Sequence, residues 1–173
     1  MITLKPFTKE DFDTLIQWID SPEFLMQWAG PNFSYPLTFE QLEEYLSGAN
    51  QRESTTLIYT VWEKDKRVGH ISLGRIDREN RAARIGKVLI GETDAKGRGL
   101  CVAMIREVLK IAFDELELHR VSLGVFDFNE PAIQCYKKAG FQIEGLLRDY
   151  RKIEEKYWSL YEMSILAEEW TGG

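Results

Sequence analysis

The stretch Lys96-Gly97-Arg98-Gly99-Leu100-Cys101 decides the fold, because it joins an apolar strand to a long amphipathic helix through a glycine-rich turn. The helix is expected from Gly99 to about Leu116. Glycines let a backbone approach a ligand closely, and free N–H groups at a helix start attract phosphate oxygens. The stretch is therefore a candidate anion-binding turn, although a tight strand-to-helix connection would by itself also favour glycine.

A second helix is expected one strand further along the chain. After a strand over Arg120–Val125, the segment Asn129-Glu130-Pro131-Ala132 is typical of a helix start, and the helix carries Ala132, Tyr136 and Ala139 on one face. The chain thus offers an anion-binding turn and, one strand away, a phenol. Binding a phosphorylated carrier and protonating a leaving group would require such a pair.

Length and composition indicate one soluble globular domain. The chain has 173 residues, of which 44% are hydrophobic and 29% charged, so we expect a single domain over residues 1–173 with its core at about 2–170. The apolar runs are too short to span a membrane, and the residues after Met1 lack the pattern of a secretory signal. A cytoplasmic protein with no membrane partner, and with Cys101 and Cys135 reduced, is the simplest expectation.

The charge and the histidine and cysteine content exclude two further classes of partner. The net charge of −6, from 28 acidic and 22 basic residues, makes nucleic-acid binding a poor prospect and mildly favours a cationic partner. The two histidines, His70 and His119, are far apart in sequence and form no ligand cluster with the cysteines. We therefore expect no metal.

The order of expected elements indicates a mixed α/β fold. Strands are expected at Ile2–Phe7, Leu57–Glu63, Val68–Leu73, Ala83–Ile90, Phe141–Leu147 and Tyr157–Ile165, with helices after Thr8 and from Thr38 to about Ala49. The segment from Trp28 to Pro36 is interpreted as an aromatic loop. This order corresponds to an antiparallel first half joined to a β-α-β unit with parallel pairing.

Three ordered motifs resemble the GNAT superfamily of CoA-dependent N-acyltransferases. They are the turn Lys96–Cys101, the spacing Asn129-x-x-Ala132-x-x-x-Tyr136 and the ending Ala139-Gly140-Phe141. The tail Glu144–Arg148, with Trp158 and Met163–Leu166, is similar to the branch that contains the ribosomal-protein N-terminal acetyltransferases. The resemblance implies a mixed, mostly antiparallel sheet of about seven strands, splayed at the cofactor site and flanked by about four helices.

The resemblance also implies acetyl-CoA as co-substrate and assigns residues to it. Backbone N–H groups of Lys96, Gly97, Arg98, Gly99, Leu100 and Cys101 would bind the pyrophosphate, with added charge from Lys96 and Arg98. The superfamily usually has Arg or Gln where Lys96 stands, and Gly or Ala where Cys101 stands. Val88, Leu89 and Ile90 would pair with the pantetheine arm like an extra strand, and one N–H there would stabilise an oxyanion. Without the resemblance they are an ordinary buried strand.

The resemblance gives Tyr136 the role of general acid. Its phenol, with an ordinary pKa near 10, stays protonated at neutral pH and can donate a proton to the departing thiolate. Asn129, with Ala132 on the same helix, would contact the pantetheine arm. The alternatives are that Tyr136 anchors its helix to the sheet and that Asn129 is an N-cap.

The acceptor, the base and the assembly are less defined by the sequence. The implied reaction is direct acetyl transfer to a primary amine, on a small molecule or a protein N-terminus, with a monomer or homodimer expected. Glu92 could be the base or a solvated carboxylate. The resemblance implies an acceptor cleft framed by aromatic residues, although these side chains could instead fold into the core: Trp28, Phe33, Tyr35 and Trp158. Glu43, Glu44, Glu154 and Glu155 could attract a cation or form solvated faces. A CoA-binding protein without turnover is the alternative function.

Overall fold

The structure is a computed structural model that describes residues 1–91 and 99–172. The strands are β1 (Ile2–Pro6), β2 (Leu57–Glu63), β3 (Lys66–Asp77), β4 (Ala82–Ile90), β5 (Arg120–Phe126), β6 (Gln142–Ile153) and β7 (Lys156–Leu166). The α-helices in the described residues are α1 (Phe12–Trp18), α2 (Pro22–Ala29), α3 (Phe39–Leu46), α4 (Leu100–Leu109) and α5 (Glu130–Lys138). Short helical turns are η1 (Lys9–Asp11), η2 (Gly30–Asn32) and η5 (Ala167–Glu169), and η4 (Lys110–Glu115) is π-helical.

The seven strands form a mixed sheet in the order β1-β2-β3-β4-β5-β7-β6. The pair β4 with β5 is parallel, whereas β1 with β2, β2 with β3, β5 with β7 and β6 with β7 are antiparallel. The predicted mixed, mostly antiparallel α/β sheet is therefore confirmed, with five α-helices among the described residues where about four were expected. The chain groups into two compact units, residues 1–74 with 86–100 and residues 75–85 with 101–173, and β3 and β4 contribute to both. A single domain over residues 1–173 stays a prediction.

The first unit begins with β1 and three short helices whose starts follow from capping residues. The Ser21 hydroxyl accepts a hydrogen bond from the Phe24 N–H, and Pro22 occupies the first helical position of α2. The Thr38 hydroxyl caps α3 in the same way through the Gln41 N–H. The expected loop from Trp28 is wrong in its first residues, because Ser21-Pro22 starts a helix that includes Trp28 rather than only ending the previous one.

The core of the first unit consists of apolar side chains from these helices and from β2 and β4. Phe12 and Leu42 are completely buried, Ile58 of β2 lies with them, and Leu89 of β4 closes the cluster. The spacing of Phe12 and Leu15 in α1 gives the buried stripe that the sequence predicts. Burial of these faces fixes α1, α2 and α3 on this part of the sheet.

The second unit contains the β-α-β crossover and the last hairpin. The parallel ladder of β4 with β5 comprises Ala82–Arg84 opposite Arg120–Ser122. The two terminal guanidinium nitrogens of Arg84, Nη1 and Nη2, donate to the Glu162 carboxylate of β7, at 2.6 and 3.0 Å. This two-pronged ion pair connects β4 to β7, and Arg84 also donates to the Ser122 hydroxyl of β5. Such geometry stabilises more than a single exposed contact does.

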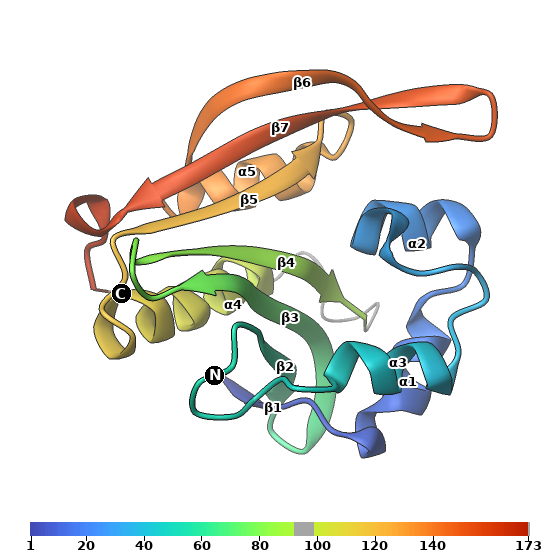
Figure 1. Ribbon diagram of the computed structural model, residues 1–173, viewed down its shortest axis with the longest axis horizontal. Helices are drawn as coiled ribbons and strands as arrows, with labels where there is room; N and C mark the ends of the chain where they lie inside the picture. Colours follow the sequence, from blue (N-terminus) through green and yellow to red (C-terminus); the bar gives the residue numbers. More distant parts are fainter. Residues whose placement is uncertain (92–98, 173) are drawn as a thin grey trace. The chain divides into compact units, whose positions relative to one another are not determined.

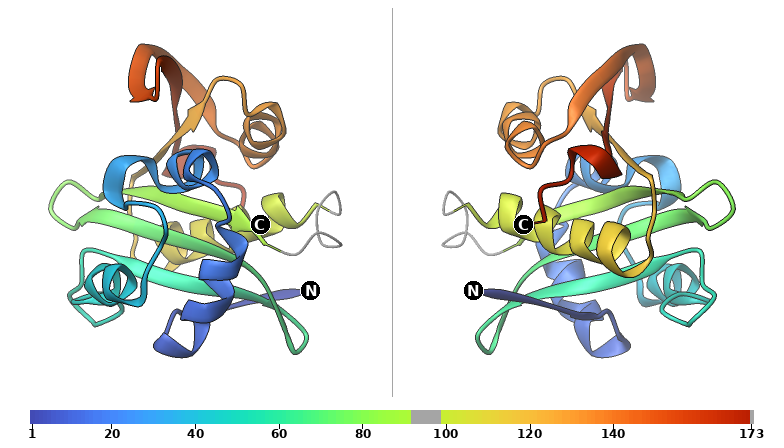
Figure 2. Two further views of the ribbon diagram at one scale, coloured as in Figure 1. Left: turned by 90° about the vertical axis from the view of Figure 1, so that its right-hand side faces the viewer. Right: turned by 90° about the vertical axis from the view of Figure 1, so that its left-hand side faces the viewer.

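Two elements of the second unit differ from the expected ranges. The α-helix from Leu100 ends at Leu109 and continues as the π-helical η4, where the Leu116 N–H donates to the Ile111 carbonyl five residues earlier; Figures 1 and 2 show the continuous coil. The β6 and β7 strands extend to Ile153 and from Lys156, so most of the expected connection at Arg148–Lys156 is strand. Pairs such as Lys152 with Tyr157 carry the ladder to the tip of the hairpin.

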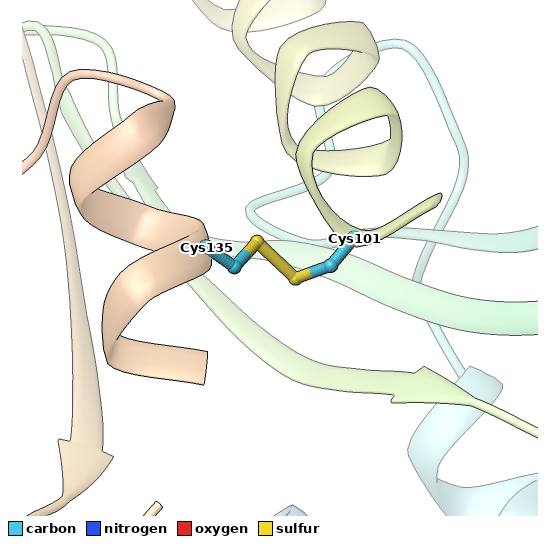
Figure 3. The surroundings of a disulfide bond; sticks show 2 residues. All are labelled: Cys101 and Cys135. Atoms are coloured by element: carbon cyan, nitrogen blue, oxygen red, sulfur yellow. A yellow bond between two sulfur atoms is a disulfide. The ribbon is translucent and has the colours of Figure 1, made fainter. Parts of the chain in front are cut away.

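A disulfide bond joins Cys101 in the first turn of α4 to Cys135 in α5 (Figure 3). Their Cα atoms lie 6.2 Å apart, a usual separation for a disulfide. The expectation of two reduced thiols is therefore wrong for this structure. The reason is tertiary: the fold brings together two helices whose cysteines are 34 positions apart in sequence.

Reduction of this disulfide should lower the free energy of unfolding by about 3–4 kcal/mol, because the bond closes a loop of 34 residues in the unfolded chain. Urea unfolding with and without dithiothreitol measures the loss. The double variant Cys101→Ala/Cys135→Ala should show the same loss and no response to reductant. Two titratable thiols in the untreated, unfolded protein would contradict the bond.

Candidate active site

The expected pyrophosphate turn is only partly described by the structure. Lys96, Gly97 and Arg98, like Glu92, lie outside the described residues. Gly99 has a left-handed φ of +77°, and a β-carbon there would have no heavy atom within 4 Å. Leu100 is buried and begins α4, and Cys101 follows in the disulfide. The described end of the turn is thus an open, glycine-dependent backbone at the start of a ten-residue helix.

The backbone of β4, the strand expected to contact the pantetheine arm, is irregular in its middle. Lys87 of β4 has a left-handed φ of +52°, which is rare for a residue with a side chain inside a strand. The paired register of β4 with β5 ends at Arg84 and does not extend to Val88, Leu89 or Ile90. Backbone N–H and C=O groups on that edge can therefore pair with an extended ligand, as in β-strand addition.

The helix α5 presents the candidate general acid. Tyr136 is 6% exposed and lies against Phe141, with ring centroids 6.2 Å apart. Burial raises the pKa of the Tyr136 phenol well above its ordinary value, so the hydroxyl remains a proton donor at neutral pH. Asn129 occupies the N-cap position of α5, but its side chain makes no capping hydrogen bond. Ala132, on the same helix, is half-buried.

A cavity of about 530 Å³ lies in the first unit, within the ~300–1,000 Å³ typical of small-ligand sites. Its lining includes Asn32, Phe33, Gln41, Glu44, Tyr45 and Lys87. The Lys87 ammonium lies 5.1 Å from the ring centroid of Tyr45 and 5.9 Å from that of Phe33. These are cation–π distances, so the rings of Tyr45 and Phe33 hold the Lys87 side chain in place.

Behind the cavity wall, Tyr45 connects to a buried histidine of β3. The Tyr45 hydroxyl and the Nε2 atom of His70 are 2.9 Å apart, and His70 is 1% exposed between the rings of Phe7 and Trp28. Burial, aided by the charge of Lys87, lowers the pKa of His70 to about 3. His70 is therefore neutral near pH 7, and burial raises the pKa of Tyr45 above its ordinary range.

A family model for the acetyltransferase (GNAT) domain matches residues 1–142. The chain belongs to this GNAT family. An uncharacterized N-acetyltransferase of Bacillus licheniformis, p20, is 30% identical over 99% of this chain and 96% of that protein. The L-amino acid N-acetyltransferase AaaT of Escherichia coli is 33% identical over 56% of this chain and 60% of that protein. The putative ribosomal N-acetyltransferase YdaF of Bacillus subtilis is 36% identical over 60% of this chain and 56% of that protein.

Solved structures show the same fold. The spermidine N-acetyltransferase of Vibrio cholerae, in complex with CoA and spermine, has a TM-score of 0.83 and 24% identity, over 97% of this chain and 96% of that one. Membership of the GNAT family makes this chain an acyltransferase that acetylates an amine, and acetyl-CoA is the family's co-substrate. The open turn at Gly99 and the unpaired edge of Val88–Ile90 fit that group.

The aromatic residues predicted to frame the acceptor cleft do not all line the cavity of this GNAT chain. Phe33 lines the cavity, whereas Trp28 is buried and stacks on Phe33 with centroids 5.9 Å apart. The Tyr35 hydroxyl donates to the Asp20 carbonyl, and Trp158 packs on Phe126 in the second unit. The sequence analysis missed Tyr45 and Lys87. An alternating strand pattern does not reveal the left-handed backbone of Lys87, and the contact of Tyr45 in α3 with that residue is tertiary.

The glutamates predicted to attract a cation also have different surroundings. Glu44 lines the cavity, and Glu43 forms an exposed ion pair with Lys9 at 3.1 Å. Glu154 and Glu155 lie at the tip of the β6–β7 hairpin. In residues 1–91 and 99–172, His, Cys, Asp and Glu form no group of three that could hold a metal. Within the same residues, no helix is both long and apolar enough to cross a bilayer.

His70 should make the free energy of unfolding decrease as the pH falls below about 6.5. The unfolded chain binds a proton at this residue below pH 6.5, but the folded chain binds it only near pH 3. The contribution is complete above pH 6.5 and is lost as the pH falls toward 3, by up to about 1.4 kcal/mol per pH unit. Urea unfolding between pH 7 and 4 should therefore show a shallower decline for His70→Gln than for the wild type.

The exposed His119 provides the matched control. The three proteins contain the same carboxylates, and we expect His119→Gln to keep the wild-type pH slope. An unchanged slope in His70→Gln would mean that His70 is protonated in the folded protein.

Proposed function

We propose that this enzyme transfers an acetyl group directly from acetyl-CoA to a primary amine bound in the cavity beside Lys87. The observation that carries the proposal is the position of Lys87, which lines the cavity and directly precedes the unpaired edge of Val88–Ile90. A ligand paired along that edge would reach the cavity wall without leaving the strand. The amine acceptor would thus meet the thioester at the left-handed turn of β4.

The co-substrate would be held mainly by backbone groups, with charge added at the pyrophosphate. N–H groups of residues 96–101 would bind the pyrophosphate at the start of α4, with Lys96 and Arg98 adding charge. The pantetheine arm would pair with the backbone of Val88, Leu89 and Ile90. The side-chain amide of Asn129, which makes no capping hydrogen bond, would donate to the same arm, beside Ala132. When bound, acetyl-CoA supplies an activated acetyl thioester.

Tyr136 would act as the general acid. Its buried phenol keeps its proton at neutral pH and would donate it to the sulfur as the carbon–sulfur bond breaks. An N–H near Leu89 or Ile90 would stabilise the developing oxyanion. Because both cysteines are joined in the disulfide, neither offers a thiolate, and this supports direct transfer without an acyl-enzyme.

The acceptor is proposed as a small-molecule amine or a protein N-terminus. The names of the relatives cover both, since they include an L-amino acid, a ribosomal and a spermidine acetyltransferase. Release of free thiol from acetyl-CoA in the presence of amino acids, polyamines and N-terminal peptides tests the function. Binding of acetyl-CoA without thiol release by any amine would overturn it.

Replacing Gly99 should weaken cofactor binding without unfolding the protein. Gly99→Val puts a branched side chain at φ +77° in the open space of the turn, where it would strain the backbone and shield the N–H groups. We expect at least a ten-fold weaker Kd for acetyl-CoA by calorimetry. Gly48→Val is the matched control, because Gly48 has the same φ of +77° and the same open surroundings; its affinity should stay unchanged.

Removing the phenol of Tyr136 should slow the chemical step alone. Tyr136→Phe keeps the packing on Phe141 and deletes the proton donor, so kcat should fall by roughly ten-fold or more while acetyl-CoA affinity changes little. Steady-state thiol release gives kcat, and calorimetry gives the affinity. Tyr59→Phe in β2 removes a hydroxyl elsewhere and should keep wild-type kcat. Wild-type turnover of Tyr136→Phe would exclude the acid role.

A further inference from the structure

The residue that directly follows β4, Gly91, is covered by the indole of Trp18. A β-carbon at Gly91 would overlap Cδ2 and Cε2 of Trp18, the two carbons that the five- and six-membered rings share. The middle of the indole, and not its rim, therefore lies against the Gly91 backbone. Only a residue without a β-carbon allows so close an approach of backbone and ring.

The Trp18 ring is itself held by the core of the first unit. Trp18 is the last residue of α1, is half-buried and packs against the apolar cluster of that unit. Phe12 and Leu15 of the same helix are buried in the cluster. Because protein interiors leave few voids, the indole has no free space into which it can move away from Gly91.

A backbone hydrogen bond holds Gly91 in addition to the ring. The Gly91 N–H donates to the Val68 carbonyl of β3 at 2.9 Å. At the other end of the same edge, the side chain of Lys87 lies against two aromatic rings of the cavity wall. The three residues of the unpaired edge, Val88–Ile90, therefore lie between two points at which the backbone is held.

We propose that Trp18 is a positioning residue for acetyl-CoA, because its indole fixes Gly91 and thereby the direction in which Val88–Ile90 presents its N–H and C=O groups. This rests on the proposed function, in which the pantetheine arm pairs with that edge. Such hydrogen bonds require N···O distances of about 2.7–3.2 Å, so a displaced edge weakens all of them together. Trp18 acts through the backbone and needs no contact with the cofactor.

The test is a double-mutant cycle between Trp18 and Gly91, measured as the Kd for acetyl-CoA by calorimetry. Gly91→Ala should weaken binding about ten-fold or more, because the new methyl group cannot share the space of the indole and the edge must shift. Trp18→Ala should weaken binding about five-fold, since the edge loses one of its supports. In the Trp18→Ala background, Gly91→Ala should add less than about a two-fold loss, because the obstructing ring is gone.

Two matched variants and one kinetic readout separate positioning from folding. Gly86→Ala adds a β-carbon in the same strand, where it would meet only the Ser72 hydroxyl at 3.7 Å, and should keep wild-type affinity. Trp62→Ala removes a tryptophan of β2 in the same unit and should also keep it. In thiol release, Gly91→Ala should raise KM for acetyl-CoA and leave KM for the amine within about two-fold, whereas a smaller folded fraction would lower only the apparent kcat.

The outcomes distinguish this inference from the function on which it rests. Wild-type affinity for acetyl-CoA in Trp18→Ala, or an equal loss from Gly91→Ala in both backgrounds, would overturn the inference and leave acetyl transfer standing. If one single variant does not fold, the other decides, because wild-type affinity in either one contradicts the positioning role. A wild-type protein that releases no thiol with any amine would overturn the proposed function as well.

Discussion

The short parallel ladder between β4 and β5 is the constraint on which the arrangement of the second unit depends. It is held by Arg84, which lies over Gly124 so closely that a β-carbon there would come within 2.7 Å of the guanidinium. The same guanidinium binds Glu162 of β7 through two nitrogens and the Ser122 hydroxyl of β5. Three strands are thus registered by one side chain, and the ladder stops where this contact ends.

The consequence for the site is a strand with two different halves. Up to Arg84, β4 is an ordinary sheet member, and from Lys87 onward its edge is not paired with β5. A left-handed residue at the change of character costs backbone energy, and such strain persists where surrounding contacts hold it. Here the rings of Tyr45 and Phe33 supply those contacts. The contacts that hold the backbone of β4 at Lys87 are therefore also part of the cavity wall.

The fold could be predicted from local patterns wherever the pattern and the packing agree. The strand Leu57–Glu63 has the expected bounds, and Asn129-Glu130-Pro131 precedes α5 as expected. Where the sequence analysis was wrong, the decisive signal was tertiary or was overlooked. The π-helical end of α4 has no local signature, the disulfide depends on proximity across two helices, and Ser21-Pro22 was available as a helix start but was interpreted as a break. The family was predictable from the ordered motifs, whereas the cavity beside Lys87 was not.

The wall of the cavity is supported by a buried histidine whose charge does not change near neutral pH. His70 would be the natural pH switch in such a site, but burial keeps it neutral from about pH 3 upward. Its role is to fix Tyr45, whose ring supports Lys87, so the imidazole contributes position rather than charge. A histidine with an ordinary pKa would add a second positive charge near Lys87 as the pH falls through about 6.5, and burial of His70 prevents that change.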